Sequence, residues 1–174
     1  PETLYVIADE KWVATQNNNN ENVMIKSIVT FDSINSKPRR YLNNKRIFAE
    51  YKDGIIGQVL DYIYYSYDVS KFKNIFVMGD GARWIKSVVN YFKFNFDTNV
   101  IFALDKFHFK QAIHHICLDE KLEEIISSYV INNNRKAFKA CCNCLIESFP
   151  HREETINKKK DYIINNWSNI LNLY

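Results

Sequence analysis

Residues 74–85, NIFVMGDGARWI, contain the clearest indication of the fold. The uninterrupted apolar run at 74–78 is typical of a β-strand that is covered on both faces. A Gly-Asp-Gly turn follows it, and residues 82–92 then space their apolar side chains as a helix does. A buried strand that leads directly into a helix is the unit from which parallel sheets are built.

Upstream of this unit, three segments predict strands and one predicts a helix. Residues 4–16, 22–31 and 46–51 are rich in β-branched and aromatic side chains, which favour strands. The polar segment 33–44 predicts a loop, and the apolar spacing in 55–67 predicts a helix. Because the three leading strands leave no room for helices between them, they favour an antiparallel meander.

Downstream, residues 100–104 predict another fully buried strand, and the chain reads as helix after helix from Phe107 onward. Strands that follow helices favour parallel addition through right-handed crossovers. We therefore expect an α/β fold: an RNase H-like mixed five-stranded sheet flanked by helices over residues 1–117, then an all-helical segment over 118–174. A flavodoxin-like doubly wound sheet is the alternative, but it needs helices between the first three strands.

Composition limits the class of protein. The chain has 174 residues and a net charge of +3, which suits one domain with an appendage and is compatible with a nucleic-acid partner. No apolar window is long enough for a membrane span, and the start lacks the pattern of a signal peptide. Because the chain begins at Pro1, we expect a piece of a longer protein. We also expect that protein to be located in the cytoplasm and associated with the nucleoid.

The four cysteines lie in the last third of the chain, three of them within residues 141–144. A disulfide framework would spread its cysteines more widely, and adjacent cysteines on a helix point to different sides, which does not favour structural zinc. The spacing therefore predicts reduced thiols buried in a helical core.

Three aspartates stand at strand positions: Asp9 inside the first strand, Asp80 after the fourth and Asp105 after the fifth. If the first strand is central and the fourth pairs beside it, Asp9 and Asp80 converge. Two such carboxylates favour Mg²⁺ or Mn²⁺, and two ions roughly 3.5–4 Å apart promote in-line phosphoryl transfer. The alternative is that Asp80 and Asp105 only cap the helices that follow them. Asp9 caps nothing.

Three motifs together resemble those of bacterial insertion-sequence DDE transposases, Mutator-like and of the ISLre type. They are IAD at 7–9, VMGDGARWI at 77–85 and LDKFH at 104–108, and the resemblance covers residues 4–112. It implies an RNase H-like catalytic core that cuts DNA and joins strands with Mg²⁺. By motif, Asp9 and Asp80 match the first two acids and metal ligands, and His108 matches the histidine after the fifth strand.

The resemblance leaves some positions open. A third acid, a Glu, is expected on a later helix, beyond Tyr174; within the chain, Glu120 and Glu147 are candidates by residue type alone. Asp105 has no settled role in the catalytic set, and Glu10 stands where the first motif usually has Gly. Two alternatives remain: another RNase H-like nuclease, or a catalytically inert, domesticated copy that serves as a DNA-binding or assembly module.

Transposon ends and target DNA are the partners that the resemblance implies, together with a homodimer. Arg83 and the basic loop with Lys37, Arg39 and Arg40 are the residues we expect to contact the DNA backbone. The alternative for the loop is an ordinary solvated turn.

Overall fold

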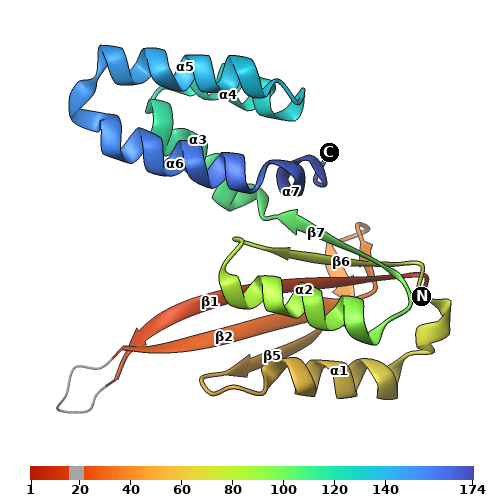
Figure 1. Ribbon diagram of the computed structural model, residues 1–174. Coiled ribbons are helices and arrows are strands. Elements are labelled where there is room, and N and C mark those ends of the chain that lie inside the picture. The colour runs from red at the N-terminus through yellow and green to blue at the C-terminus, as the bar shows by residue number, and fades with distance from the viewer. Residues whose placement is uncertain (16–21) are drawn as a thin grey trace. The chain divides into compact units, whose positions relative to one another are not determined.

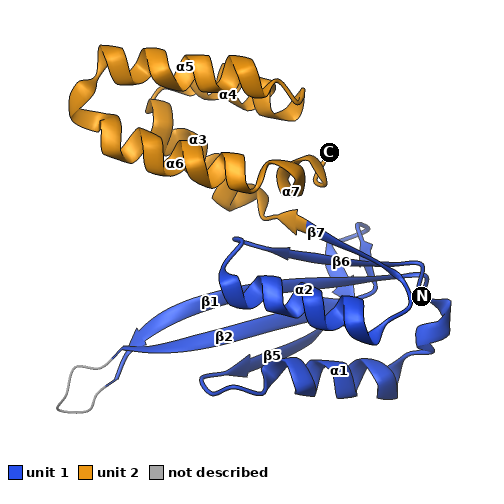
Figure 2. Cartoon of the chain, viewed as in Figure 1, with its two compact units in different colours: residues 1–102 blue, residues 103–174 orange. Residues whose placement is uncertain are grey.

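The computed structural model describes residues 1–15 and 22–174. The chain forms two compact units, Pro1–Phe102 and Ala103–Tyr174, which are described separately below (Figure 2). Across the described residues, no helix combines the length and the apolar character that crossing a membrane requires.

The first unit is built on a mixed sheet of five strands (Figure 1). The order is β5-β2-β1-β6-β7, with β1 and β5 antiparallel to β2 and with β1 parallel to β6. This confirms the predicted RNase H-like α/β sheet and the central place of the first strand. The strands are β1 (Thr3–Ala14), β2 (Asn22–Phe31), β5 (Arg46–Glu50), β6 (Asn74–Gly79) and β7 (Asn99–Leu104).

Two helices, α1 (Ile55–Ser66) and α2 (Arg83–Asn95), pack their apolar sides on one face of this sheet. A 3₁₀ turn, η1 (Val69–Lys71), lies between α1 and β6. Burial of each large apolar side chain stabilises the unit by about 1.5–3 kcal/mol. Fully buried members of this core are Leu4, Val6, Ile28, Val59, Ile63, Ile75, Val77, Ile85, Val88 and Phe92.

The segment between β2 and β5 corrects the prediction of a loop. It forms a separate two-stranded ribbon from β3 (Ser33–Asn35) and β4 (Tyr41–Asn43). Polar side chains tie the two strands together: the amide of Asn43 donates to the Ser33 hydroxyl at 2.9 Å, and the amide of Asn35 donates to the Tyr41 hydroxyl at 2.8 Å. Because these strands are held by polar groups, they lack the apolar alternation by which strands are recognised.

The second unit is helical. Its elements are α3 (Lys106–Cys117), α4 (Glu120–Ile131), α5 (Arg135–Ser148), η2 (Pro150–Arg152), α6 (Glu153–Asn165) and α7 (Trp167–Leu171). We predicted a boundary after residue 117, whereas the chain divides by compactness after Phe102. The reason is that Phe109, Ile113 and Ile116 of α3 pack in one core with side chains of the later helices.

Candidate functional site

Asp9 lies in the middle of β1, and Asp80 directly follows the neighbouring strand β6. Every residue pair between β1 and β6 differs by 71 positions, up to Ile7 opposite Met78. If it continues two residues past this last pair, the same register would set Asp9 opposite Asp80. Neighbouring strands lie about 4.8 Å apart, so carboxylates at that register can share one cation.

Gly79 shows that the close approach of β1 and β6 continues past the last paired residues. A Cβ built on Gly79 would lie 2.8 Å from the carbonyl oxygen of Ala8 and 2.8 Å from Cδ1 of Ile85. The space at this glycine is therefore filled by β1 and α2. Gly81 has φ +88°, a conformation that favours glycine and turns the chain into α2.

The two carboxylates have different surroundings. Asp9 is exposed on the sheet face opposite Val6 and Ala8, and its Oδ1 accepts the backbone N–H of Glu10 at 2.8 Å. Asp80 is half-buried, and its Oδ1 accepts the backbone N–H of Ala82 at 2.8 Å.

Asp80 is not the N-cap of α2. That position belongs to Ala82, which makes no side-chain capping bond, and the first turn of α2 contains no acid. Asp80 instead accepts the backbone N–H of Ala82 and so closes the turn that leads into α2.

Glu10 has a structural role that the sequence did not predict. Its side chain lies on the helix-covered face of β1, where its carboxylate accepts a hydrogen bond from the Trp84 indole of α2. Lys26, opposite Glu10 on β2, lies 6.0 Å from the Trp84 ring centroid and forms a 2.8 Å ion pair with Asp53. This pairing lowers the pKa of Asp53. The only signal in the sequence was the alternation that puts Glu10 on the same face as Ala8.

A groove of about 500 Å³ lies beside this network, between α1 and α2. Lys26, Asp53, Ile56, Trp84 and Tyr91 are among its lining residues. It is on the helix-covered side of the sheet, whereas Asp9 faces the other side.

Asp105 and His108 belong to the second unit. Asp105 is the N-cap of α3, and its side chain accepts the backbone N–H of Phe107 at 2.5 Å. Capping therefore explains this acid without a catalytic role. Nδ1 of His108 lies 3.8 Å from Asp105 Oδ1 and has no hydrogen-bond partner within the described part of the chain.

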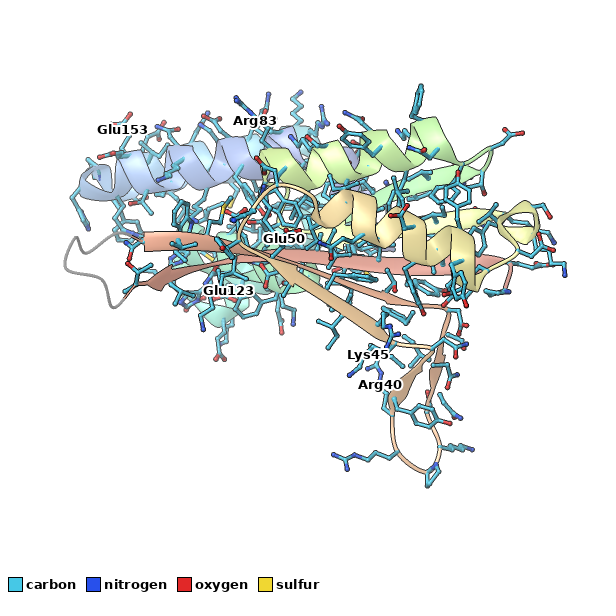
Figure 3. All side chains as sticks on the ribbon, turned by 90° about the horizontal axis from the view of Figure 1, so that it is seen from below. Arg40, Lys45, Glu50, Arg83, Glu123 and Glu153 are labelled. Atoms are coloured by element: carbon cyan, nitrogen blue, oxygen red, sulfur yellow. The ribbon has the colours of Figure 1, made fainter. Side chains whose placement is uncertain are left out.

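The predicted DNA-contacting residues are exposed. Arg83 is the first residue of α2 and is labelled in Figure 3. Lys37, Arg39 and Arg40 all lie in the turn between β3 and β4. The two candidate third acids, Glu120 and Glu147, are exposed on helices of the second unit.

The cysteines are free. Cys117 and Cys142 are buried in the helical core, as predicted, whereas Cys141 is only half-buried and Cys144 is exposed. Burial raises the pKa of the Cys142 thiol to about 12. His114, which lies near Cys117 in sequence, instead contacts Glu123 at 2.6 Å. Within residues 1–15 and 22–174, no three or more His, Cys, Asp or Glu side chains are arranged to hold a metal ion.

Comparison with curated proteins finds relatives in Caldanaerobacter subterraneus subsp. tengcongensis. The UPF0236 proteins TTE2489 and TTE0402 are each 27% identical to this chain over 96% of its length, which is 36% and 34% of their own. A third relative, 28% identical with 96% and 36% coverage, has a name that combines eleven locus designations. The chain thus spans about a third of the length of the relatives it matches.

No solved structure matches the chain. A family model, described as "Uncharacterised protein family (UPF0236)", matches residues 2–174. Since this match covers nearly the whole sequence, the chain belongs to the uncharacterised protein family UPF0236.

Proposed function

We propose that this chain is part of the catalytic core of a DDE transposase, which cleaves DNA phosphodiesters and transfers strands with Mg²⁺ or Mn²⁺. The observation that supports the proposal is the β1–β6 register, which would set Asp9 opposite Asp80 if it continues two residues past its last pair, Ile7 opposite Met78, in an RNase H-like sheet. The motifs around both residues resemble those of insertion-sequence transposases, and Asp80 lies two residues before Ala82, the N-cap of α2.

The multiplicity of the relatives supports a mobile element. One UPF0236 sequence carries eleven locus designations in a single organism, and two others carry four and two. A gene that moves with its own product accumulates such copies, whereas a housekeeping nuclease does not. This favours a transposase over another RNase H-like nuclease.

In the proposed reaction, Asp9 and Asp80 would hold the cations through carboxylate oxygens. Bound cations supply Lewis acidity at the phosphate and help to ionise the attacking hydroxyl. Water forms a bond to phosphorus as the bond to the 3′ oxygen breaks, which leaves a 5′-phosphate and a 3′-hydroxyl. That 3′-hydroxyl then forms a bond to a phosphorus of the target DNA as the target's own bond from phosphorus to its 3′ oxygen breaks and a target 3′-hydroxyl leaves. Arg83 would contact the backbone beside Asp80. A third carboxylate, expected beyond Tyr174, would complete the set.

Metal binding to residues 1–174 tests the proposal without requiring activity. We expect Mn²⁺ and Mg²⁺ to raise the melting temperature, and the electron paramagnetic resonance signal of free Mn²⁺ to fall as the ion binds. Asp9→Asn and Asp80→Asn should each abolish both effects. Asp53→Asn removes an exposed aspartate from the same unit and serves as the matched control.

Two results would count against the proposal. If the parent chain binds no Mn²⁺, the inert assembly module becomes the better explanation. If Asp53→Asn reduces binding as much as Asp9→Asn does, the ions respond to overall charge rather than to the pair of strand carboxylates.

A further inference from the structure

The connection between β2 and β5 presents an unneutralised cluster of positive charge. Lys37, Arg39 and Arg40 fall within four consecutive positions at the turn between β3 and β4, and all three are exposed. Among the residues that the structure describes, none of the three forms an ion pair. Figure 3 shows this ribbon extending away from the sheet, with Arg40 labelled on it.

Ribbon residues 33–43 are organised by polar contacts rather than by a core. Besides the two bonds between β3 and β4, Asp32 at the base accepts from the Ser33 hydroxyl at 2.9 Å and from the Asn44 amide at 2.5 Å. Asp32, the acid nearest to the turn in sequence, thus makes these hydrogen bonds at the base of the ribbon, away from the turn. Ile34 and Tyr41 remain 42% and 51% exposed, so the ribbon buries little apolar surface of its own.

We infer that ribbon residues 33–43 form an arm that binds duplex DNA, through phosphate contacts from Lys37, Arg39 and Arg40. The inference rests on the proposed function, for which it identifies a second contact region outside the carboxylate site. A two-stranded ribbon fits the width of the DNA major groove, and guanidinium and ammonium groups bind phosphates irrespective of sequence. Arg46, the first residue of β5, is not part of the arm because its guanidinium packs on the Tyr62 ring at 5.5 Å.

The register places this arm at a distance from the proposed chemistry. β2 ends at Phe31, opposite Tyr5, and Asp9 lies four residues farther along β1. At about 3.3 Å per residue, roughly 13 Å of sheet, or about four base-pair steps of DNA, separate Asp9 from Phe31, where the chain enters the arm. The arm therefore contacts flanking DNA and contributes to affinity, whereas Asp9 and Asp80 act at the cleaved phosphate.

Fluorescence anisotropy with a labelled 30-base-pair duplex tests the arm, in EDTA so that the metal site has no part in binding. Each phosphate contact contributes about 0.9 to the slope of log K against log salt. In the triple variant Lys37→Ala, Arg39→Ala, Arg40→Ala the slope should decrease by about 2.7. Between 50 and 200 mM salt, the affinity of the parent chain should then fall about 40-fold more than that of the variant.

A matched variant removes the same number of charges elsewhere: Lys158→Ala, Lys159→Ala, Lys160→Ala in α6. It should keep the parent slope, and a variant with Arg39→Lys and Arg40→Lys should keep it too because charge is retained. Circular dichroism confirms that each variant is folded.

Equal losses in both triple variants would overturn the inference, because net charge alone would then set affinity. The inference also fails if the variant Lys37→Ala, Arg39→Ala, Arg40→Ala binds duplex DNA as the parent chain does. It fails as well if that variant loses binding to phosphatidylserine vesicles but keeps its binding to duplex DNA. If the parent chain does not bind duplex DNA in EDTA, the inference that the ribbon is a DNA-binding arm is rejected. The proposed function is tested separately, by Mn²⁺ titration of the parent chain and of the Asp9→Asn and Asp80→Asn variants.

Discussion

Replacement of Gly79 with Ala tests the contact that holds β6 against β1. The new Cβ would lie 2.8 Å from the Ala8 carbonyl oxygen and 2.8 Å from Ile85 Cδ1. The isoleucine methyl can rotate away, but the carbonyl belongs to the central strand and can move only if the strands separate. Such overpacking typically costs 1–3 kcal/mol. We expect the free energy of unfolding of the first unit to fall by about 2 kcal/mol.

Gly57→Ala provides the matched control. Gly57 lies in α1, and a Cβ there would meet nothing within 4 Å. Alanine in a helix is about 0.5–1 kcal/mol more favourable than glycine, so this variant should be more stable than the parent. Urea denaturation followed by circular dichroism measures both. If Gly79→Ala is as stable as the parent, β1 and β6 are not in close contact at Ala8, and the register argument for Asp9 and Asp80 fails.

Three further substitutions or treatments test other contacts. Trp84→Phe removes the donor to Glu10 and should lower stability by about 1–2 kcal/mol in urea denaturation; an unchanged midpoint would show that this bond contributes nothing. Asp105→Ala removes the N-cap of α3 and should cost about 1 kcal/mol, whereas a loss of Mn²⁺ binding in this variant would assign it a metal role instead. Iodoacetamide at pH 8 should alkylate exposed Cys144 before buried Cys142, as read by peptide mass spectrometry. Burial raises the pKa of Cys142 from 9 to about 12, so between these pH values the folded chain keeps a proton that the unfolded chain loses. The free energy of unfolding should therefore fall as the pH rises from 9 to 12. A free energy of unfolding that does not change over this range would contradict the prediction.

Most of the sheet could be predicted because the apolar composition of its strands indicates that they are buried. The run at 74–78 became β6 (Asn74–Gly79), and 100–104 became β7 (Asn99–Leu104). Strand order followed from the absence of helices among the first three strands. The ribbon of β3 and β4 could not be predicted, since its strands are stabilised by side-chain amides and hydroxyls that are equally common in loops.

The candidate site was predictable only in part. The opposition of Asp9 and Asp80 follows from strand order together with a register that the sequence does not specify. For Asp105, capping was an open alternative, and the bond to the Phe107 N–H supports it. The Glu10–Trp84 bond was beyond sequence reasoning because it joins residues 74 positions apart.

Asp9 and Glu10 are neighbouring acids, and the strand sends them to opposite faces. Glu10 is explained by the fold: it meets the Trp84 indole beneath α2. Asp9 is not, because among the described residues its carboxylate is seen to accept a local N–H, that of Glu10, and aspartate is among the residues least suited to strands. A β-branched residue at position 9 would serve the sheet better, by up to about 1 kcal/mol. Stability therefore does not account for Asp9, which is why we propose that it holds a cation together with Asp80.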